Sequence, residues 1–436
     1  MWELKPVSEL CLLAIDCVNK TAPLSEDITP YKMLRTTNIK SGFIDFETVR
    51  YVGEDIFAKW TRRAQPQYGD VVFTREAPAG EVGRFTAKSG KYFLGQRLFL
   101  YRTNPTLLDW NYLAYVLQSP QIQGYVNGIA YGATVPHMAV SDMEHLKIPV
   151  PPITVQKKIG DILSHYDDLI ESNLRRIKLL EEMAQINYEE WFVRLRFPGH
   201  TTTPIDKNTS LPEGWRIVNL GSCFSHEIGG GWGEDEISEE FSKSAHVIRG
   251  TDMDGLASGD IYGVPLRFHK ENNLSSRRLK SGDIIFEVSG GSQNEGVAKT
   301  ALITDSLLLQ FSGDVMCASF CKLARPVSEK HSPFLFHFLR FLRKTKATEV
   351  FEIRSASNIV NYNWTAFLKF QNVKLPSIRL LELFDNSASS MHNQIYNLAK
   401  QNQHLREARD ILLPRLMTGV IDAEKYQPEN LLKEIA

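Results

Sequence analysis

Residues 151–192 read PPITVQKKIGDILSHYDDLIESNLRRIKLLEEMAQINYEEWF, with no Pro after Pro152 and no Gly after Gly160. Mostly apolar residues recur in this stretch at two interleaved seven-residue intervals. Such a pattern predicts a long helix whose a and d positions pack along one partner helix. The a series is Leu163, Ile170, Ile177, Ala184 and Trp191, and the d series is Ile159, Tyr166, Asn173, Leu180 and Asn187.

The same pattern returns near the C-terminus, where Pro414 is expected to end the second helix. Its a series is Leu381, Ala388, Ile395 and Asn402, and its d series is Phe384, Met391, Leu398, Leu405 and Leu412. A shift of 225 residues places Leu163 on Ala388 and Leu180 on Leu405, so the two helices are predicted to be copies of one another. The alternative is two ordinary amphipathic surface helices, which rarely run about 40 residues without a break.

Size and composition indicate a globular protein of several domains. The chain has 436 residues, 43% of them hydrophobic and 23% charged, a length that suggests about three domains. No apolar run reaches the roughly 18 residues of a membrane span, and the N-terminus does not resemble a signal peptide. Five Cys without metal or disulfide spacing favour a reducing, cytoplasmic location. A net charge of −1 argues against a protein that coats nucleic acid, although it averages over local patches.

Each long helix follows a segment that alternates short strands with turns. In the first segment we expect strands at 70–74, 92–94 and 98–101, and a helix at 109–118 capped by Asp109. The second segment repeats the first, since Gly69-Asp-Val-Val-Phe73 corresponds to Gly282-Asp-Ile-Ile-Phe286. The expected boundaries are a first α+β domain at 1–150, a helix at 151–197, a linker at 198–214, a second α+β domain at 215–376, a helix at 377–418 and a tail at 419–436.

Basic residues gather in the first domain between Lys59 and Arg102, where nine Lys or Arg face three acids. Aromatic residues are interleaved with them, as in surfaces that contact phosphates and bases. The alternative is a solvated surface that happens to be basic, and this is the better interpretation of any one of these side chains alone. Taken together, the cluster favours nucleic acid, with Arg62, Arg63, Arg75 and Lys88 as the candidate contacts.

The second domain has basic stretches of its own at 267–270 and 277–280, with only Glu271 opposing them along the chain. An acidic run, Glu234-Asp-Glu236 with Glu239 and Glu240, either pairs with a basic partner or forms a solvated loop. The glycine-rich Gly229–Gly233 is expected to be a flexible loop and lacks the Lys of a phosphate-binding P-loop. The candidate DNA contacts in this domain are Arg249, Lys270, Arg277, Arg278 and Lys280.

We find no catalytic constellation and no metal-ligand motif in the sequence. No Gly-x-Gly-x-x-Gly follows a strand, and no His-Glu-x-x-His is present. Asp283 and Glu287 weakly resemble a nuclease carboxylate pair, but Asp283 is better explained as closing the turn after Gly282. An enzyme with divergent nuclease or methyltransferase motifs remains the second hypothesis, and a purely structural coiled-coil scaffold the third. Turnover by the isolated chain distinguishes the second, and salt-dependent, sequence-selective DNA binding excludes the third.

Several stretches carry a family resemblance through their order, spacing and duplication. They are Gly132–His137, Leu146–Gln156, Glu190–Gly199, Leu211–Trp215 and Leu412–Gly419. The chain resembles the specificity (S) subunit of Type I restriction-modification systems over nearly its full length. The second copy departs from the pattern at Pro376-Ser377 and Leu381, and Ser355–Asn358 only faintly matches the Gly-x-Thr turn of the first.

The resemblance implies two duplicated α+β target recognition domains, separated by two long helices that form an antiparallel coiled coil. Each domain would read one half of a bipartite target in double-stranded DNA. Two modification subunits, which carry S-adenosylmethionine and the adenine methylation chemistry, would dock on the chain, and restriction subunits would add to that complex. The chain itself would be non-catalytic, with no cofactor or metal and no membrane partner.

Chain connectivity independently predicts that the helices pair antiparallel. About 15 residues separate Phe197 from the second domain, so the second helix must begin near the end of the first. A parallel arrangement would leave roughly 60 Å to cover. If Asn173 faces Asn402, facing residue numbers sum to 575. Ile177 then meets Leu398, Leu180 meets Ile395 and Trp191 meets Phe384, and the Asn pair fixes the register.

Overall fold

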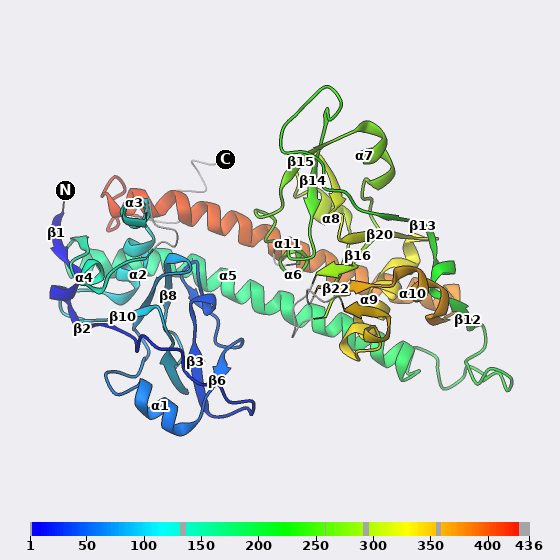
Figure 1. Cartoon of the computed structure of the whole chain (residues 1–436), viewed down its shortest axis with the longest axis horizontal. Helices are drawn as coiled ribbons and strands as arrows, with labels where there is room; N and C mark the ends of the chain where they lie inside the picture. The colour runs from blue at the N-terminus through cyan, green and yellow to red at the C-terminus, as the bar shows by residue number, and fades with distance from the viewer. Residues whose placement is uncertain (1, 131–136, 258, 291–295, 355–358, 427–436) are drawn as a thin grey trace. The chain divides into compact units, whose positions relative to one another are not determined.

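A computed structural model describes residues 2–130, 137–257, 259–290, 296–354 and 359–426 of the chain (Figure 1). Two compact units divide it: unit 1 comprises Met1–Asp168 with Leu405–Ala436, and unit 2 comprises Leu169–His404. The two long helices each contribute to both units, so the predicted domain boundaries remain a proposal. The Gly-x-Thr turn at 132–136 and its counterpart at 355–358 lie outside the described residues.

Unit 1 is built on a four-stranded antiparallel sheet in the order β2-β10-β7-β8. Its strands are β2 (Cys11–Asp16), β10 (Leu98–Thr103), β7 (Val71–Arg75) and β8 (Ala79–Arg84). The smaller sheets are β6-β3-β9, β1-β11 and β4-β5. Their strands are β1 (Glu3–Pro6), β3 (Tyr31–Leu34), β4 (Ile39–Lys40), β5 (Phe43–Ile44), β6 (Arg50–Tyr51), β9 (Lys91–Leu94) and β11 (Lys147–Val150). The three strands expected from the sequence are confirmed as β7, β9 and β10.

Helix α2 (Trp110–Gln118) packs against the sheet of unit 1 and joins its largest apolar cluster. It begins where predicted, because the Asp109 carboxylate accepts a hydrogen bond from the Tyr112 amide at 2.9 Å. The cluster also takes in Ile159 and Leu163 from the first long helix and Leu412 from the second. The other helices of this unit are α1 (Glu54–Trp60), α3 (Pro120–Ala130) and α4 (Val140–Glu144).

Unit 2 repeats the strand order of unit 1. Its four-stranded sheet is β13-β20-β16-β18, and its smaller sheets are β15-β14-β19, β12-β23 and β17-β22-β21. The parallel pair β14–β19 corresponds to β3–β9 of unit 1, so the duplication extends to strand direction. The strands are β12 (Arg216–Asn219), β13 (Phe224–Gly229), β14 (Lys243–Ile248), β15 (Leu266–His269), β16 (Ile284–Glu287), β17 (Ser289–Gly290), β18 (Thr300–Leu302), β19 (Asp314–Cys317), β20 (Cys321–Pro326), β21 (Glu352–Arg354), β22 (Val360–Tyr362) and β23 (Asn372–Leu375).

Aromatic side chains join the helices of unit 2 to the long helices. In α9 (Ser332–Lys344), Phe334 packs edge-on against Phe192, with ring centroids 4.9 Å apart. Phe192 also packs edge-on against Phe384 of the second long helix at 5.0 Å. These rings belong to the largest apolar cluster of the unit. The remaining helices are α6 (Met253–Leu256), α7 (Glu271–Arg277), α8 (Asp305–Leu308) and α10 (Trp364–Phe370).

The two long helices are α5 (Ile153–Tyr188), which continues as a π-helical turn at Glu189–Val193, and α11 (Ile378–Met417). Within unit 1 the start of α5 packs on the end of α11, and within unit 2 the end of α5 packs on the start of α11. The antiparallel coiled coil is therefore confirmed. The expected stop at Pro414 is wrong, because α11 includes Pro414 and ends at Met417.

Candidate nucleic-acid interface

The register of the helical seam is defined by a buried polar pair. Asn173 Nδ2 donates to Asn402 Oδ1 at 3.0 Å, and both residues are buried. Ile177, Leu180, Ile395 and Leu398 surround this level of the seam in one apolar cluster. The two Asn satisfy each other only in part, since Nδ2 of Asn402 has no partner in the described chain.

Arg62 and Arg63 follow the end of α1 in unit 1, and both are exposed. The Arg63 guanidinium forms an ion pair with Asp16. Within the described ranges no ion pair or hydrogen bond involves the Arg62 side chain. Of the two neighbouring cations, Arg62 is therefore the one with no ion-pair partner among the described residues.

Lys88 lies between β8 and β9 beside an exposed ring. Its ammonium nitrogen is 6.0 Å from the centre of the Tyr68 ring, and Tyr68 is 52% exposed. The Tyr68 ring packs in turn on Trp110, with centroids 5.4 Å apart. A cation held over an exposed ring suits a phosphate with a neighbouring base or sugar.

Arg75 does not reach the surface that its position in the sequence suggests. It is 8% exposed, and its Nε donates to the Met138 carbonyl at 3.0 Å. A terminal nitrogen lies 3.4 Å from His137 Nε2. Arg75 therefore stabilises the backbone at Met138. Its position among other basic residues in the sequence does not predict this role.

In unit 2 most of the candidate cations have partners within the chain. Arg277 donates from Nε to the Gly229 carbonyl at 2.9 Å, and Arg278 pairs with Asp314 at 2.8 Å. Arg249 forms two hydrogen bonds to Asp252, at 2.9 and 2.7 Å. Lys280 is exposed, and its ammonium has no ion-pair partner among the described residues.

Lys270 and Arg267 each pair with an acidic side chain that is distant in the sequence, where only Glu271 lies next to them. Lys270 pairs with Glu240, and Arg267 pairs with Asp235. The acidic run therefore lies against the basic stretch of its own domain, and the expectation that only one acid opposes this stretch is wrong. The β13–β14 connection brings the two together, a long-range contact that spacing along the chain does not reveal.

A buried carboxylate in unit 1 escaped the sequence analysis. Asp167 is fully buried and accepts hydrogen bonds from Arg84 at 2.9 Å, from Arg409 at 2.7 Å and from the Tyr115 hydroxyl. Arg84 comes from β8, Tyr115 from α2 and Arg409 from α11. The contact therefore ties the sheet, the domain helix and the seam to one side chain. The signal in the sequence that could have identified Asp167 is an acidic residue next to the apolar seam.

The equivalent position in unit 2 carries an imidazole. The shift of 225 residues places Asp167 on His392, whose ring stacks on His337 with centroids 5.5 Å apart. His337 Nδ1 donates to Gln185 Oε1 at 2.9 Å. Burial, together with Arg340, lowers the pKa of His392 to about 4. Burial also lowers the pKa of His337 well below its usual value, with His392 and Arg340 acting in the same direction.

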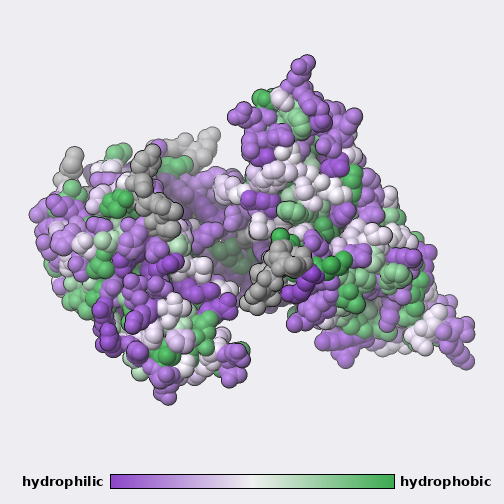
Figure 2. All heavy atoms as spheres, viewed as in Figure 1, coloured by the Kyte–Doolittle hydropathy of each residue, from purple (hydrophilic) through white to green (hydrophobic). Residues whose placement is uncertain are grey.

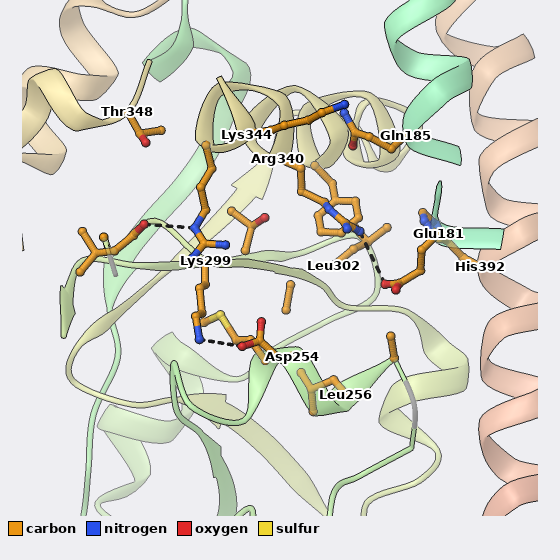
Figure 3. A pocket seen from close by; sticks show the side chains of 18 of the residues that line it. Glu181, Gln185, Asp254, Leu256, Lys299, Leu302, Arg340, Lys344, Thr348 and His392 are labelled. Carbon is orange, nitrogen blue, oxygen red and sulfur yellow. Dashed lines mark hydrogen bonds and ion pairs between the residues drawn. The ribbon is translucent and has the colours of Figure 1, made fainter. Parts of the chain in front are cut away.

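A pocket of about 660 Å³ opens beside this pair in unit 2 (Figure 3). Arg340 reaches towards Glu181 at 3.6 Å, and Lys299 pairs with Asp254 at 2.6 Å. Opposite charges thus meet inside the pocket. A second pocket of about 380 Å³ in unit 1 is lined by Asp410, which the same shift places on Gln185 of the first.

The described residues contain no group of three or more His, Cys, Asp or Glu side chains able to hold a metal ion. Asp283, the weak nuclease candidate, accepts from the Lys280 amide at 2.7 Å and from Arg325 at 2.7 and 2.8 Å. It thus closes the turn before β16. Among the same described residues, no helix is both long and apolar enough to cross a membrane.

Comparison with known proteins gives consistent matches. Residues 2–182 match the family model described as Type I restriction modification DNA specificity domain. The chain is 26% identical over 321 residues to the Type I restriction enzyme MjaIX specificity subunit of Methanocaldococcus jannaschii, covering 72% of this chain and 69% of that one. It is 21% identical over 408 residues to the Type I restriction enzyme HindI specificity subunit of Haemophilus influenzae, covering 81% and 86%.

A crystal structure of a Type-I restriction-modification system S subunit from M. genitalium aligns over 95% of this chain and 96% of its own, with a TM-score of 0.49 and 16% identity. The family model reaches from the first strand into the first long helix, and the relatives extend the match through most of the chain. These matches show that residues 2–182 resemble the Type I restriction modification DNA specificity domain, and that the chain is similar over most of its length to the specificity subunits of Type I restriction enzymes.

Proposed function

We propose that this protein is the DNA-recognition subunit of a Type I restriction-modification complex and reads a bipartite target in double-stranded DNA. The observation that carries the proposal is the duplication itself. Two α+β domains share one strand order, and each is joined to the same antiparallel helical seam. A duplicated reader fits a target with two specific halves, in the way that protein symmetry is matched by half-sites in other DNA-binding proteins.

The proposed DNA contacts begin with the exposed cations that have no ion-pair partner among the described residues. These are Arg62 in unit 1 and Lys280 in unit 2, with Lys88 beside the Tyr68 ring. Arg63, Arg249, Lys270, Arg277 and Arg278 would have to exchange an internal partner for a phosphate or base. Arg75 supports the fold of the domain and is the weakest of the original candidates.

We further propose that two modification subunits dock on the chain, supply S-adenosylmethionine and methylate adenine. The helices offer apolar surface for them at equivalent places, since Ile186 and Ile411, which differ by 225 residues, are 54% and 53% exposed. Leu179 and Met183 extend the stripe along α5 and are 58% and 52% exposed. Contiguous exposed apolar residues commonly mark protein interfaces. Restriction subunits would join the same complex, and the cytoplasm, which holds the DNA, is the proposed location.

The decisive experiment maps methylated adenines in DNA exposed to the chain together with its modification subunit. Methylation at one bipartite motif, absent when either component is left out, is the expected result. Methylation or cleavage by the chain alone would overturn the non-catalytic assignment. Sequence-independent methylation by the pair would overturn its role as the reader.

A further inference from the structure

An acidic segment, Glu234–Glu240, lies against the basic edge of unit 2. Five of its seven residues are acidic, all seven are exposed, and it contains no Lys or Arg. β15 is an edge strand of its sheet. The Glu234 amide donates to the Phe268 carbonyl at 2.9 Å, and the Phe268 amide donates to the Glu234 carbonyl at 3.0 Å. The segment thus begins with a single antiparallel β-bridge to that edge.

Arg267 anchors the segment at its first turn. The guanidinium, 7% exposed, forms an ion pair with Asp235 and donates to the Gly233 carbonyl at 3.1 Å. It also lies 4.7 Å from the centre of the Trp232 ring. Gly233 permits the close approach, because its φ is +72° and a Cβ there would lie 2.4 Å from the Phe268 carbonyl oxygen. Gly233 therefore allows the loop to pack closely against β15.

Glu240, at the far end of the segment, covers Lys270. The two side chains form an ion pair and are 67% and 45% exposed. The Lys270 ammonium also lies 5.1 Å from the centre of the Phe241 ring. Exposed pairs of this kind are weak, so a phosphate can replace the carboxylate. This part of unit 2, with β14, β15 and α7, is largely hydrophilic at its surface (Figures 1 and 2).

We propose that the acidic segment is an internal competitor for the DNA backbone: anchored on Arg267, it holds Glu240 on Lys270 until a DNA phosphate displaces it. The inference rests on the proposed function, since it requires DNA to approach this edge of unit 2. Its effect is to weaken backbone contacts, which supply nearly all of the binding to non-specific DNA. DNA without the target sequence then has no base contacts to compensate for displacing the carboxylate.

The test compares the full-length chain with two variants that each remove one negative charge. Glu240→Gln abolishes the ion pair to Lys270, whereas Glu236→Gln removes a carboxylate that has no ion pair among the described residues. Binding to a duplex without the target is measured over a salt series. Glu240→Gln is expected to bind about two- to fivefold tighter, with a salt slope steeper by about one, because Lys270 can release a counterion on meeting a phosphate.

Glu236→Gln is expected to change the affinity for this duplex and the salt slope less, because it removes a negative charge without breaking an ion pair. The double variant Glu240→Gln/Lys270→Met should lose the gain, which would trace it to this ammonium. Equal effects of Glu240→Gln and Glu236→Gln, or an undiminished gain in the double variant, would overturn the competitor. Failure of the wild-type chain with its modification subunits to bind any duplex at low salt would instead overturn the proposed function.

Discussion

Asn173 and Asn402 face each other across the helical seam at 3.0 Å, and they are the polar pair among the apolar side chains at this level. A buried amide pair costs stability relative to apolar side chains but penalises every register that separates its members. The two amides therefore give this coiled coil one preferred alignment.

Replacing Asn402 alone by Ala should lower the free energy of unfolding by about 1–3 kcal/mol, because Asn173 would keep a buried amide without a partner. Replacing both Asn by Leu should be neutral or stabilising. Urea denaturation checks both expectations. A single variant as stable as the wild type would show that water satisfies the remaining amide.

Asp167→Asn should destabilise the chain by about 3–5 kcal/mol, since it leaves Arg84 and Arg409 buried beside a neutral amide. Asp410→Asn is the matched control: Asp410 also pairs with Arg409, but its side chain is 62% exposed. Thermal and urea unfolding measure the difference. Equal losses in the two variants would contradict the central role of Asp167.

The stacked His337 and His392 predict an acid-sensitive unit 2. Their folded pKa values lie below the ordinary 6.5, so the unfolded chain binds more protons. The stabilising effect is present above pH 6.5 and is lost as the pH falls towards 4. His392 alone should lower the free energy of unfolding by about 2 kcal/mol between pH 7 and pH 5.

The pH dependence is measured by urea unfolding at both values. His392→Gln should flatten the dependence, whereas His165→Gln, at an exposed position on α5, should leave it intact. An equally steep pH dependence in His392→Gln would place the responsible group elsewhere.

The exposed cations should act on separate half-sites. Arg62→Ala with Lys88→Ala should weaken binding to one half-site and lower the salt slope by about two, since two phosphate contacts are lost. Lys280→Ala should weaken binding to the other half-site and lower the slope by about one. Duplexes with one half-site scrambled separate these effects. If both variants lost binding to the same half-site, the assignment of one half-site to each domain would be contradicted.

The helices should also act as a ruler for the spacer between half-sites. One heptad inserted into each helix at facing positions adds about 10 Å, or about 3 base pairs, which turns one domain away from its groove. Three heptads add about 32 Å, close to one turn of DNA, and should restore activity on a spacer longer by about 10 base pairs. Methylation of a spacer-length series checks this. An unchanged optimum in a folded one-heptad variant would mean that linkers or partner subunits set the distance.

The parts of this structure predictable from sequence are those with a local or periodic cause. The heptads of α5 and α11 predicted both helices, the short connection after Phe197 predicted their antiparallel pairing, and Asp109 marked the start of α2. Pro414 does not end α11, because packing of the last turn of the helix in the unit 1 core outweighs the lost hydrogen bond.

The candidate interface was predictable only as a region. Whether a cation already has a partner depends on residues distant in the chain: Met138 binds Arg75, Asp16 pairs with Arg63, and Glu240 pairs with Lys270. The Asp167 cluster likewise joins four separate segments of the chain, and the His392 cluster joins three. No spacing pattern encodes such contacts, although an acid or a His next to an apolar seam is a signal to look for.

Unit 2 is one continuous piece of chain, whereas unit 1 is completed only by the residues from Leu405 onward. During synthesis the second domain can therefore fold while the first still lacks Arg409 and Leu412, its partners for Asp167 and the apolar core. A premature stop codon shortly after residue 404 would thus damage the amino-terminal domain. It would spare the second domain, although that domain is encoded nearer to the stop codon.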